Sequence, residues 1–336
     1  MICLCRFNTG FPMYLNLISG KEISILMKKN ALLFFIRIFL GSLMVLCLVC
    51  SALAEVQPLD TDIMVHGQPL RKEGWISDHE YRDESIHILY ERMGRKPKSS
   101  RETTICRWIT IEISDPSQLR TAMSMDSYDD PGTVSAVSLA KYVNAAVALN
   151  GDYFKYNYDR GYVLRQGVLY RDALDGEWDS LIIDDQGDFH GVIEATSETM
   201  ASALKDLEAQ GRKPMNVFTF GPVLIQDGKI LREDSEYPSE MHYPTLATQR
   251  IALIQLDRLK YAVMEIDSDG GNGTGMNLGE LARFILEIYP DCKMAYNLDG
   301  GGSTHLILDG KQIHKTVSGR AVSDIIYFAS AQTPEE

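Results

Sequence analysis

The stretch Tyr296–Leu308, YNLDGGGSTHLIL, joins an apolar run, an aspartate, three glycines and a second apolar run. Met294–Leu298 predicts a strand that enters the core, so Asp299 stands at its end, where polar functional groups are common. Glycine adopts positive φ and lets a ligand approach the main chain closely. Gly300–Gly302 therefore predict a bare main-chain wall whose N–H groups face an anion, with the Ser303 hydroxyl as a further donor. The alternative is a glycine-rich bulge in a hairpin.

Strand patterns dominate the chain around this stretch. Ile105–Ile113 contains an alternating apolar and polar run, and Ala145–Leu149 predicts a buried strand that stops at Asn150-Gly151-Asp152. Arg250–Leu256 and Tyr261–Ile266 are typical of a hairpin. Further strands are expected at Ser85–Tyr90, Gly167–Tyr170, Ser180–Ile183, Phe189–Glu194, Val217–Lys229 (two strands with a Gly-Pro corner and an Asp-Gly turn) and Ile325–Ala329.

Helix patterns are fewer. One helix is expected from Asp115-Pro116-Ser117 through Met123, and another over Val134–Asn144. Ser197 is expected to cap a helix that ends at Gln210, and Leu278–Tyr289 is amphipathic. Strands outnumber helices and strict βαβ alternation is absent. The sequence thus predicts an α+β fold with mixed, largely antiparallel β-sheets and covering helices in a single main domain, rather than a doubly wound fold.

The N-terminal region carries an export pattern. Met27-Lys28-Lys29 is basic, an apolar stretch runs over 31–54, and Ser51–Ala54 suits cleavage after Ala54. Residues 27–54 therefore predict a signal peptide, with 1–26 as an upstream extension. The alternative is an uncleaved membrane anchor through 31–54. In both cases the protein is expected to be exported, to an extracellular or cell-envelope location.

The remaining chain divides into two expected parts. Residues 55–100 are interpreted as a linker or N-terminal appendage, which either donates an edge strand or spaces the protein from the membrane. Residues 101–331 are expected to form the main domain. The net charge of the whole chain is −13, and residues 55–336 hold 28 basic and 45 acidic side chains, a net charge of −17. Such a surface repels polyanions, so no nucleic acid is expected as a partner.

Cysteines and acidic residues set the expectations for metals. Only Cys106 and Cys292 lie outside 1–54, as two small buried hydrophobes or as one disulfide. Two cysteines make no structural zinc site, and no HExxH motif occurs. We expect no cofactor and no metal. The alternative is Ca²⁺ in the acidic, glycine-rich loop Asp267–Gly275, although this loop lacks the EF-hand spacing.

Several blocks resemble the phosphodiester glycosidase family. NLDGGGS, preceded by the expected helix in GMNLGELARFIL, is similar to one family block. Three others follow the family order well: ALNGDYF (Ala148–Phe154), FGPVLIQDGK (Phe220–Lys229) and GRAVSD (Gly319–Asp324). TQRIALI matches loosely, because Ile251 replaces a threonine and the family glycine is missing. The family has one Asp-Gly before the helix, whereas this chain offers both Asp267 and Asp269. The resemblance spans about Val147 to Ala329.

The resemblance implies hydrolysis of a sugar-1-phosphodiester, such as a GlcNAc-1-phosphodiester, to a sugar and a phosphomonoester. A glycan or sugar phosphate is the implied partner, and bacterial members of the family are described as exopolysaccharide-related. A carboxylate must stabilise, attack or help water attack the anomeric centre, and arginine grips phosphate. The implied catalytic residues are Asp299, Arg250, Asp267 and Asp269. The implied substrate-binding residues are Asn150, Gly151, Asp152, Gly300, Gly301, Gly302, Ser303 and Arg320.

Two other functions stay open on the sequence. The same scaffold suits a non-catalytic glycan-binding or envelope module, because a fold does not fix a function. A phosphodiesterase that attacks phosphorus in teichoic-acid-like polymers is the second. The individual residues also have structural alternatives: Arg250 and Arg320 as surface ion pairs, Asp299 as a cap of the glycine turn, and Asn150-Gly151 as an ordinary turn.

Overall fold

The computed structural model describes residues 56–129, 132–152, 160–233, 236–237, 244–268, 274–315 and 318–332. The predicted signal peptide or anchor, the candidate Asp269 and most of the acidic loop lie outside these residues. The chain from Val56 to Glu336 forms one compact unit. No helix among the described residues is long and apolar enough to span a bilayer.

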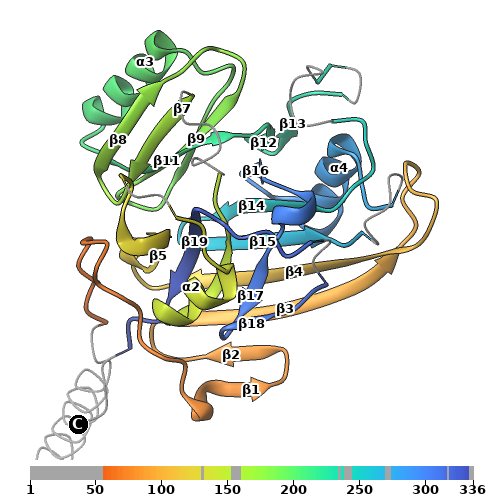
Figure 1. Ribbon diagram of the computed structural model, residues 1–336, viewed down its shortest axis with the longest axis horizontal. Helices are drawn as coiled ribbons and strands as arrows, with labels where there is room; N and C mark the ends of the chain where they lie inside the picture. Colours follow the sequence, from red (N-terminus) through yellow and green to blue (C-terminus); the bar gives the residue numbers. More distant parts are fainter. Residues whose placement is uncertain are drawn as a thin grey trace, which may run out of the picture. The chain divides into compact units, whose positions relative to one another are not determined.

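The largest β-sheet has nine strands in the order β1-β2-β3-β4-β15-β14-β16-β12-β13 (Figure 1). All of its strand pairings are antiparallel. The strands span Trp75–Ser77 (β1), Glu80–Arg82 (β2), Ile86–Arg95 (β3), Thr104–Ile113 (β4), Lys260–Ile266 (β15), Arg250–Asp257 (β14), Met294–Leu298 (β16), Val223–Gln226 (β12) and Lys229–Ile230 (β13).

Two five-stranded sheets, named here by their central strands, are also antiparallel throughout. The β11 sheet contains Phe189–Val192 (β10), Asp179–Asp184 (β9), Pro214–Phe220 (β11), Gly161–Arg165 (β7) and Val168–Ala173 (β8), in that order. The β6 sheet contains Lys311–Gln312 (β18), Leu306–Leu308 (β17), Ala145–Asn150 (β6), Asp324–Ala329 (β19) and Leu119–Met123 (β5), in that order.

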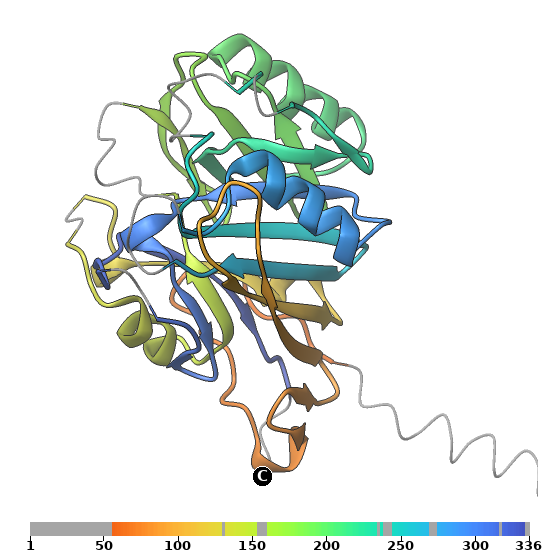
Figure 2. The same ribbon diagram turned by 90° about the vertical axis from the view of Figure 1, so that its right-hand side faces the viewer.

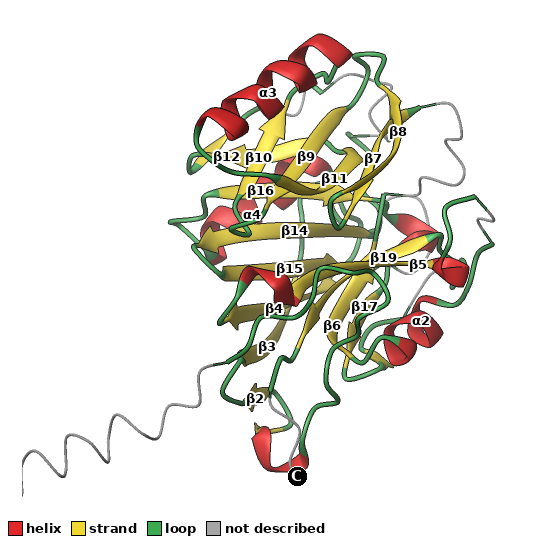
Figure 3. Ribbon diagram, turned by 90° about the vertical axis from the view of Figure 1, so that its left-hand side faces the viewer, coloured by secondary structure: helices red, strands yellow, loops and turns green. Residues whose placement is uncertain are grey.

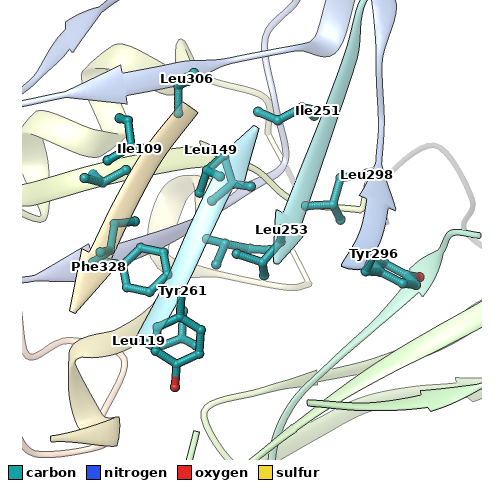
Figure 4. Packing of buried hydrophobic residues seen from close by; sticks show 14 of the residues in the cluster. Ile109, Leu119, Leu149, Ile251, Leu253, Tyr261, Tyr296, Leu298, Leu306 and Phe328 are labelled. Atoms are coloured by element: carbon teal, nitrogen blue, oxygen red, sulfur yellow. The ribbon is translucent and has the colours of Figure 1, made fainter. Parts of the chain in front are cut away.

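Alternation along β14 shows how the sequence builds the core. Side chains of successive strand residues point to opposite faces. Ile251 and Leu253 join the cluster between the sheets, whereas Ala252 and Ile254 join the cluster beneath a helix. Figure 4 shows Leu253 packed among residues of several strands. Because both faces of β14 are covered, its sequence is a continuous apolar run rather than an alternating one.

Three α-helices of the described residues cover the outer faces of the sheets. Leu278–Ile288 (α4) packs on the nine-stranded sheet and buries its apolar face against β4, β14 and β15 (Figure 2). Ala136–Tyr142 (α2) covers the β6 sheet, and Ser197–Ala209 (α3) covers the β11 sheet (Figure 3). The prediction of an α+β fold with largely antiparallel sheets in one main domain is confirmed.

The predicted helix from Asp115 to Met123 is wrong. Asp115 does cap a helical turn, through its carboxylate and the Gln118 side chain, but this 3-10 turn spans only Pro116–Gln118. Leu119–Met123 then forms β5, all of it buried and paired with β19. Tertiary pairing therefore overrides the local start signal. The cap of α3 is also one residue earlier than expected, at Thr196 rather than Ser197.

The structure decides between the alternatives left open for residues 55–100 and for the two cysteines. Residues 75–95 form β1–β3 at the edge of the nine-stranded sheet, so this part of 55–100 donates edge strands. Cys106 and Cys292 are buried and free, so the disulfide alternative is wrong. Both thiols lie in the cluster beneath α4, and burial raises the pKa of each to about 12. They are therefore small core residues.

Candidate active site

Strand ends from all three sheets meet around Asp299. Asp299 follows β16 of the nine-stranded sheet, and Asn150 ends β6. Asp324 begins β19, which pairs with β6 so that Ile325 lies opposite Asn150. Arg165 ends β7 of the β11 sheet. This convergence gathers charged side chains that are far apart in the sequence.

The glycine turn after Asp299 needs three glycines for separate reasons. A Cβ on Gly300 would lie 2.6 Å from the Gln249 carbonyl oxygen, and one on Gly302 would lie 2.2 Å from the Ser318 hydroxyl. Gly301 has φ of +55°, which disfavours residues with a side chain. The turn is thus pressed between a neighbouring strand and the 318–320 segment.

The predicted wall of N–H groups facing an anion stays a prediction, and several donors of the turn have partners within the protein. The N–H groups of Gly301, Ser303 and Thr304 donate to the carbonyls of Gln249, Gly300 and Gly301, respectively. The Gly300 N–H bonds the Asp299 carboxylate. Because these four donors have partners inside the protein, they are not free to bind a ligand in this conformation.

Asp299 carries the chemically unusual group of the site. Its Oδ2 is buried and makes no hydrogen bond to the described residues. Burial raises the pKa of Asp299 to about 6, although the Ser303 hydrogen bond and the Arg320 charge oppose the shift. An unpaired buried carboxylate oxygen is costly to stability, so its retention points to a role in chemistry.

Arg320 is the cation that the structure brings to the glycine turn. Its Nη1 donates to Ser303 Oγ over 3.0 Å, and its main-chain N–H donates to the Gly302 carbonyl. The residue is exposed. Arg320 therefore stands beside Asp299 at the surface, where a charged substrate can reach it.

Asn150 ties the strand end to the glycine turn. Its Nδ2 donates to the carbonyl oxygens of Asp299 (2.9 Å) and Gly151 (3.2 Å), and its Oδ1 accepts from the His305 N–H. Both amide hydrogens have partners within the protein. This geometry favours a positioning role for Asn150 over contact with a sugar, which stays a prediction.

A buried arginine holds two aspartates behind the turn. Arg165 Nη2 donates to Asp152 Oδ1 (2.8 Å) and Asp324 Oδ2 (2.9 Å), and Nε donates to the same Asp324 oxygen. Asp152 also accepts the Thr219 N–H. Asp324 Oδ1, like Asp299 Oδ2, is buried without a hydrogen bond to the described residues. Burial raises the pKa of Asp324 above its usual range.

The side chains of Arg250 and Asp267 do not line the cavity at Asp299 and have other partners. The Arg250 side chain is buried and donates to the carbonyls of Met276 and Leu246. Burial lowers its pKa to about 10. Asp267 accepts Arg107 Nη1 at 3.1 Å. Neither side chain lines the cavity at Asp299, so their roles in binding and catalysis stay predictions.

Asp267 belongs to a group of metal-ligand type with Glu265 and His314. Arg107 Nη1 donates to both carboxylates, which already neutralises much of their charge. Burial lowers the pKa of His314 to about 3, so its ring is neutral. His314 Nε2 accepts the Leu306 N–H, Nδ1 lies 3.1 Å from Gln249 Nε2, and Nδ1 also faces Glu265. These contacts fit an ion-pair network better than a metal site.

A cavity of about 10 Å³ marks where the candidates meet. Of the residues predicted from sequence, Asn150, Gly151, Asp299 and Ser303 line it. Sequence reasoning missed Asp324, which lines it with Val322 and Ser323. The available signal was its place at a strand boundary, which mirrors that of Asp299.

The structure thus places an aspartate with an unpaired buried oxygen beside an exposed arginine, at a point where strands of three sheets end. A family model described as phosphodiester glycosidase matches residues 143–329. The chain belongs to the phosphodiester glycosidase family, and membership indicates a phosphodiester glycosidase-like function.

One solved structure has a similar fold. The catalytic domain of zebrafish N-acetylglucosamine-1-phosphodiester alpha-N-acetylglucosaminidase, auto-inhibited by its pro-peptide, is 18% identical with a TM-score of 0.57. That match covers 79% of this chain and 87% of the zebrafish chain. A hypothetical protein from Synechocystis (15% identity, TM-score 0.46, 73% of this chain and 62% of that one) and a putative exported protein from Burkholderia pseudomallei (13%, 0.44, 69% and 75%) are more distant. No curated protein matches the chain.

Proposed function

We propose that this protein is an exported hydrolase that cleaves a sugar-1-phosphodiester of the GlcNAc-1-phosphodiester type on envelope or extracellular glycans. The products are a sugar and a phosphomonoester. Family membership supports the reaction class. The observation that carries the proposal is Asp299 Oδ2, a buried carboxylate oxygen that is unpaired among the described residues and lines a cavity beside an arginine.

Asp299 suits the carboxylate role in glycoside cleavage. With a pKa of about 6, it is mostly ionised at neutral pH. An ionised carboxylate next to the anomeric carbon stabilises positive charge there or accepts a proton from water. Phosphate is a good leaving group, so the reaction does not demand a strong general acid.

Arg320 suits the phosphate. A diester phosphate keeps one negative charge, and the planar guanidinium matches two of its oxygens. Because the mature chain is strongly acidic, a local cation is needed to hold an anionic substrate. Arg320 is exposed at the edge of the site and fulfils this need. The other predicted phosphate ligand, Arg250, organises the loops at Leu246 and Met276.

The export proposal is supported by the sequence of residues 27–54 alone. Fractionation of cells that express the full chain checks it: the protein is expected in the medium or envelope fraction. Recovery in the cytosol alone would contradict export. Whether the released protein begins at Glu55 distinguishes a cleaved signal from an anchor.

Turnover of defined substrates tests the reaction. The mature chain, residues 55–336, is incubated with a GlcNAc-1-phosphate methyl diester and with UDP-GlcNAc, beside Asp299→Asn and Arg320→Ala. We expect sugar release by the wild type and loss of turnover in Asp299→Asn at retained folding. Binding of these ligands without turnover supports a glycan-binding module instead, and unchanged rates in both variants exclude these residues from the mechanism.

A further inference from the structure

Asp324 and Asp299 share a feature beyond their proximity. Each has one buried carboxylate oxygen, Asp324 Oδ1 and Asp299 Oδ2, that makes no hydrogen bond to the described residues. Both residues line the same small cavity. Two acceptors left unpaired at one place call for a common donor.

The size of the cavity fits one water molecule. Its volume is about 10 Å³, close to the minimum of about 10–15 Å³ that a single water requires. A water there would bridge the two orphan oxygens, donating a hydrogen bond to an ionised carboxylate and accepting one from a protonated carboxyl group. Gly151 lets the Asp324 carboxylate pack closely against the main chain at this cavity, because a Cβ at that position would lie 2.1 Å from Asp324 Oδ1.

The charges around the cavity do not balance. Asp152, Asp299 and Asp324 face Arg165 and Arg320, so three carboxylates stand against two guanidinium groups. Arg165 and Asp324 are almost fully buried, where an excess charge is costly. One proton on the cluster restores neutrality. Asp152 is bound by Arg165 and the Thr219 N–H through both oxygens, which leaves the orphan oxygens of Asp299 and Asp324 as the place for that proton.

We propose that Asp324 is the second carboxylate of the site, and that Asp299 and Asp324 hold one water molecule between them and share a single proton. The use of this water in hydrolysis rests on the function proposed above. Coupled carboxylates of this kind titrate as a pair, with the second ionisation shifted upward by the charge of the first.

Hydrolysis begins at the water molecule between the two aspartates. An O–H bond of the water breaks, and its proton moves to the ionised Asp299 Oδ2. The electron pair of the water oxygen forms the bond to the anomeric carbon. The bond between that carbon and the phosphate oxygen breaks, and its electron pair leaves with the phosphomonoester. Asp324 keeps the shared proton and orients the water, and Asp299 then releases its new proton to solvent.

Infrared titration of the folded mature chain tests the shared proton without any substrate. A protonated carboxyl group has a C=O stretch that a carboxylate lacks. We expect the wild type to retain such a band near neutral pH and to lose it as the pair ionises fully. Either Asp299→Asn or Asp324→Asn is expected to remove the pair's band at neutral pH, because the remaining carboxyl then ionises without a charged partner.

Glu265→Gln is the matched control. Burial raises the pKa of Glu265 to about 7, but this residue does not line the cavity, so its substitution removes only its own contribution to the band. The proposal is overturned if the neutral-pH band disappears entirely in Glu265→Gln, or if it persists unchanged in both aspartate variants. Circular dichroism confirms that each variant is folded.

The pH dependence of kcat/KM adds a readout that a purely structural role of Asp324 does not move. The wild type is expected to lose activity at alkaline pH as the shared proton leaves, whereas Asp324→Asn keeps lower activity, by about 10²-fold, without this alkaline fall. An alkaline fall that persists in Asp324→Asn contradicts the inference. If the infrared result holds and no sugar 1-phosphodiester is cleaved, the proton-sharing pair stands and the proposed function fails.

Discussion

Two buried aspartate–arginine pairs on this scaffold differ in how completely they are satisfied. Asp179 receives Arg232 on both oxygens, at 2.6 and 3.0 Å, and each oxygen also accepts a main-chain N–H at 2.9 Å. Asp324 receives Arg165 on one oxygen only, and its other oxygen is unpaired among the described residues. Every carboxylate oxygen of Asp179 therefore has hydrogen-bond partners within the protein. Asp324 needs a partner from outside the chain, such as the proposed water, to satisfy its second oxygen.

The difference separates stability from function. A buried carboxylate with every lone pair engaged ties strands β9 and β12 to the segment before Glu233, as expected of a structural pair. An incomplete pair that lines a cavity lowers stability locally and persists where chemistry requires it. Substitutions at Asp179 therefore serve as a structural reference for the effects of substitutions at Asp299 and Asp324.

The largest expected effect is on catalysis. Asp299→Asn removes the charge that faces the cavity, and kcat is expected to fall by about 10²–10⁴-fold. Asp309→Asn is the matched control, because this exposed turn aspartate has φ of +48°, a conformation that asparagine tolerates. Equal activities of the two variants on a sugar 1-phosphodiester would contradict the assignment.

The two aspartates are expected to differ in the opposite sense for stability: the Asp179 substitution lowers the free energy of unfolding more than the Asp324 substitution does. Asp179→Asn leaves the buried Arg232 with only the exposed Glu194 carboxylate at 3.9 Å, and its cost is expected to be about 3–5 kcal/mol. Asp324→Asn is expected to cost less, because it relieves the excess of carboxylates around Arg165. Urea unfolding of both variants with a common m-value gives the comparison. A larger loss for Asp324→Asn means that its pair is the structural one.

Substrate binding is expected to change with Arg320. Arg320→Ala removes a charged donor at the edge of the site, and KM is expected to rise by about 10–100-fold. Arg320→Lys keeps the charge without the forked geometry, so it is expected to restore part of the loss. Steady-state kinetics at low and high salt measure both variants. A KM that is unchanged in Arg320→Ala removes this residue from phosphate recognition.

The smallest expected effect is a pH dependence of stability. The pKa of Asp299 rises from 3.8 to about 6 on folding, so the folded state binds the proton more tightly. Its contribution to stability is complete below the unfolded pKa and is lost as pH rises through about 6. The free energy of unfolding of the wild type, relative to Asp299→Asn, is therefore expected to fall over this range. A constant difference between the two contradicts the raised pKa.

Local patterns predicted much of the fold. The hairpin of β14 and β15 follows from two apolar runs on either side of a short polar turn, and the helix α4 follows from apolar periodicity. The glycine triplet is also a local signal, and it pointed to Asp299. Leu119–Met123 was assigned to a helix because a good cap precedes it, but pairing with β19 makes it a strand. Such pairing is not visible in a short window of sequence.

The rest of the site depends on contacts between distant segments. Asp324 gains its role from Arg165, which is 159 residues away and belongs to another sheet. Arg250 was predicted to bind phosphate from its residue type, whereas the structure buries its guanidinium among loop carbonyls. Residue chemistry alone indicates which groups are capable of a role, and the fold decides which of them meet.

Hydrolysis of a GlcNAc-1-phosphate methyl diester in isotope-labelled water tests the central claim most directly. If the carboxylates at the Asp299 cavity direct water to the anomeric carbon, the label enters the released sugar and the phosphomonoester stays unlabelled. Label in the phosphate instead shows attack at phosphorus and contradicts the account, as does the absence of any turnover by the folded chain.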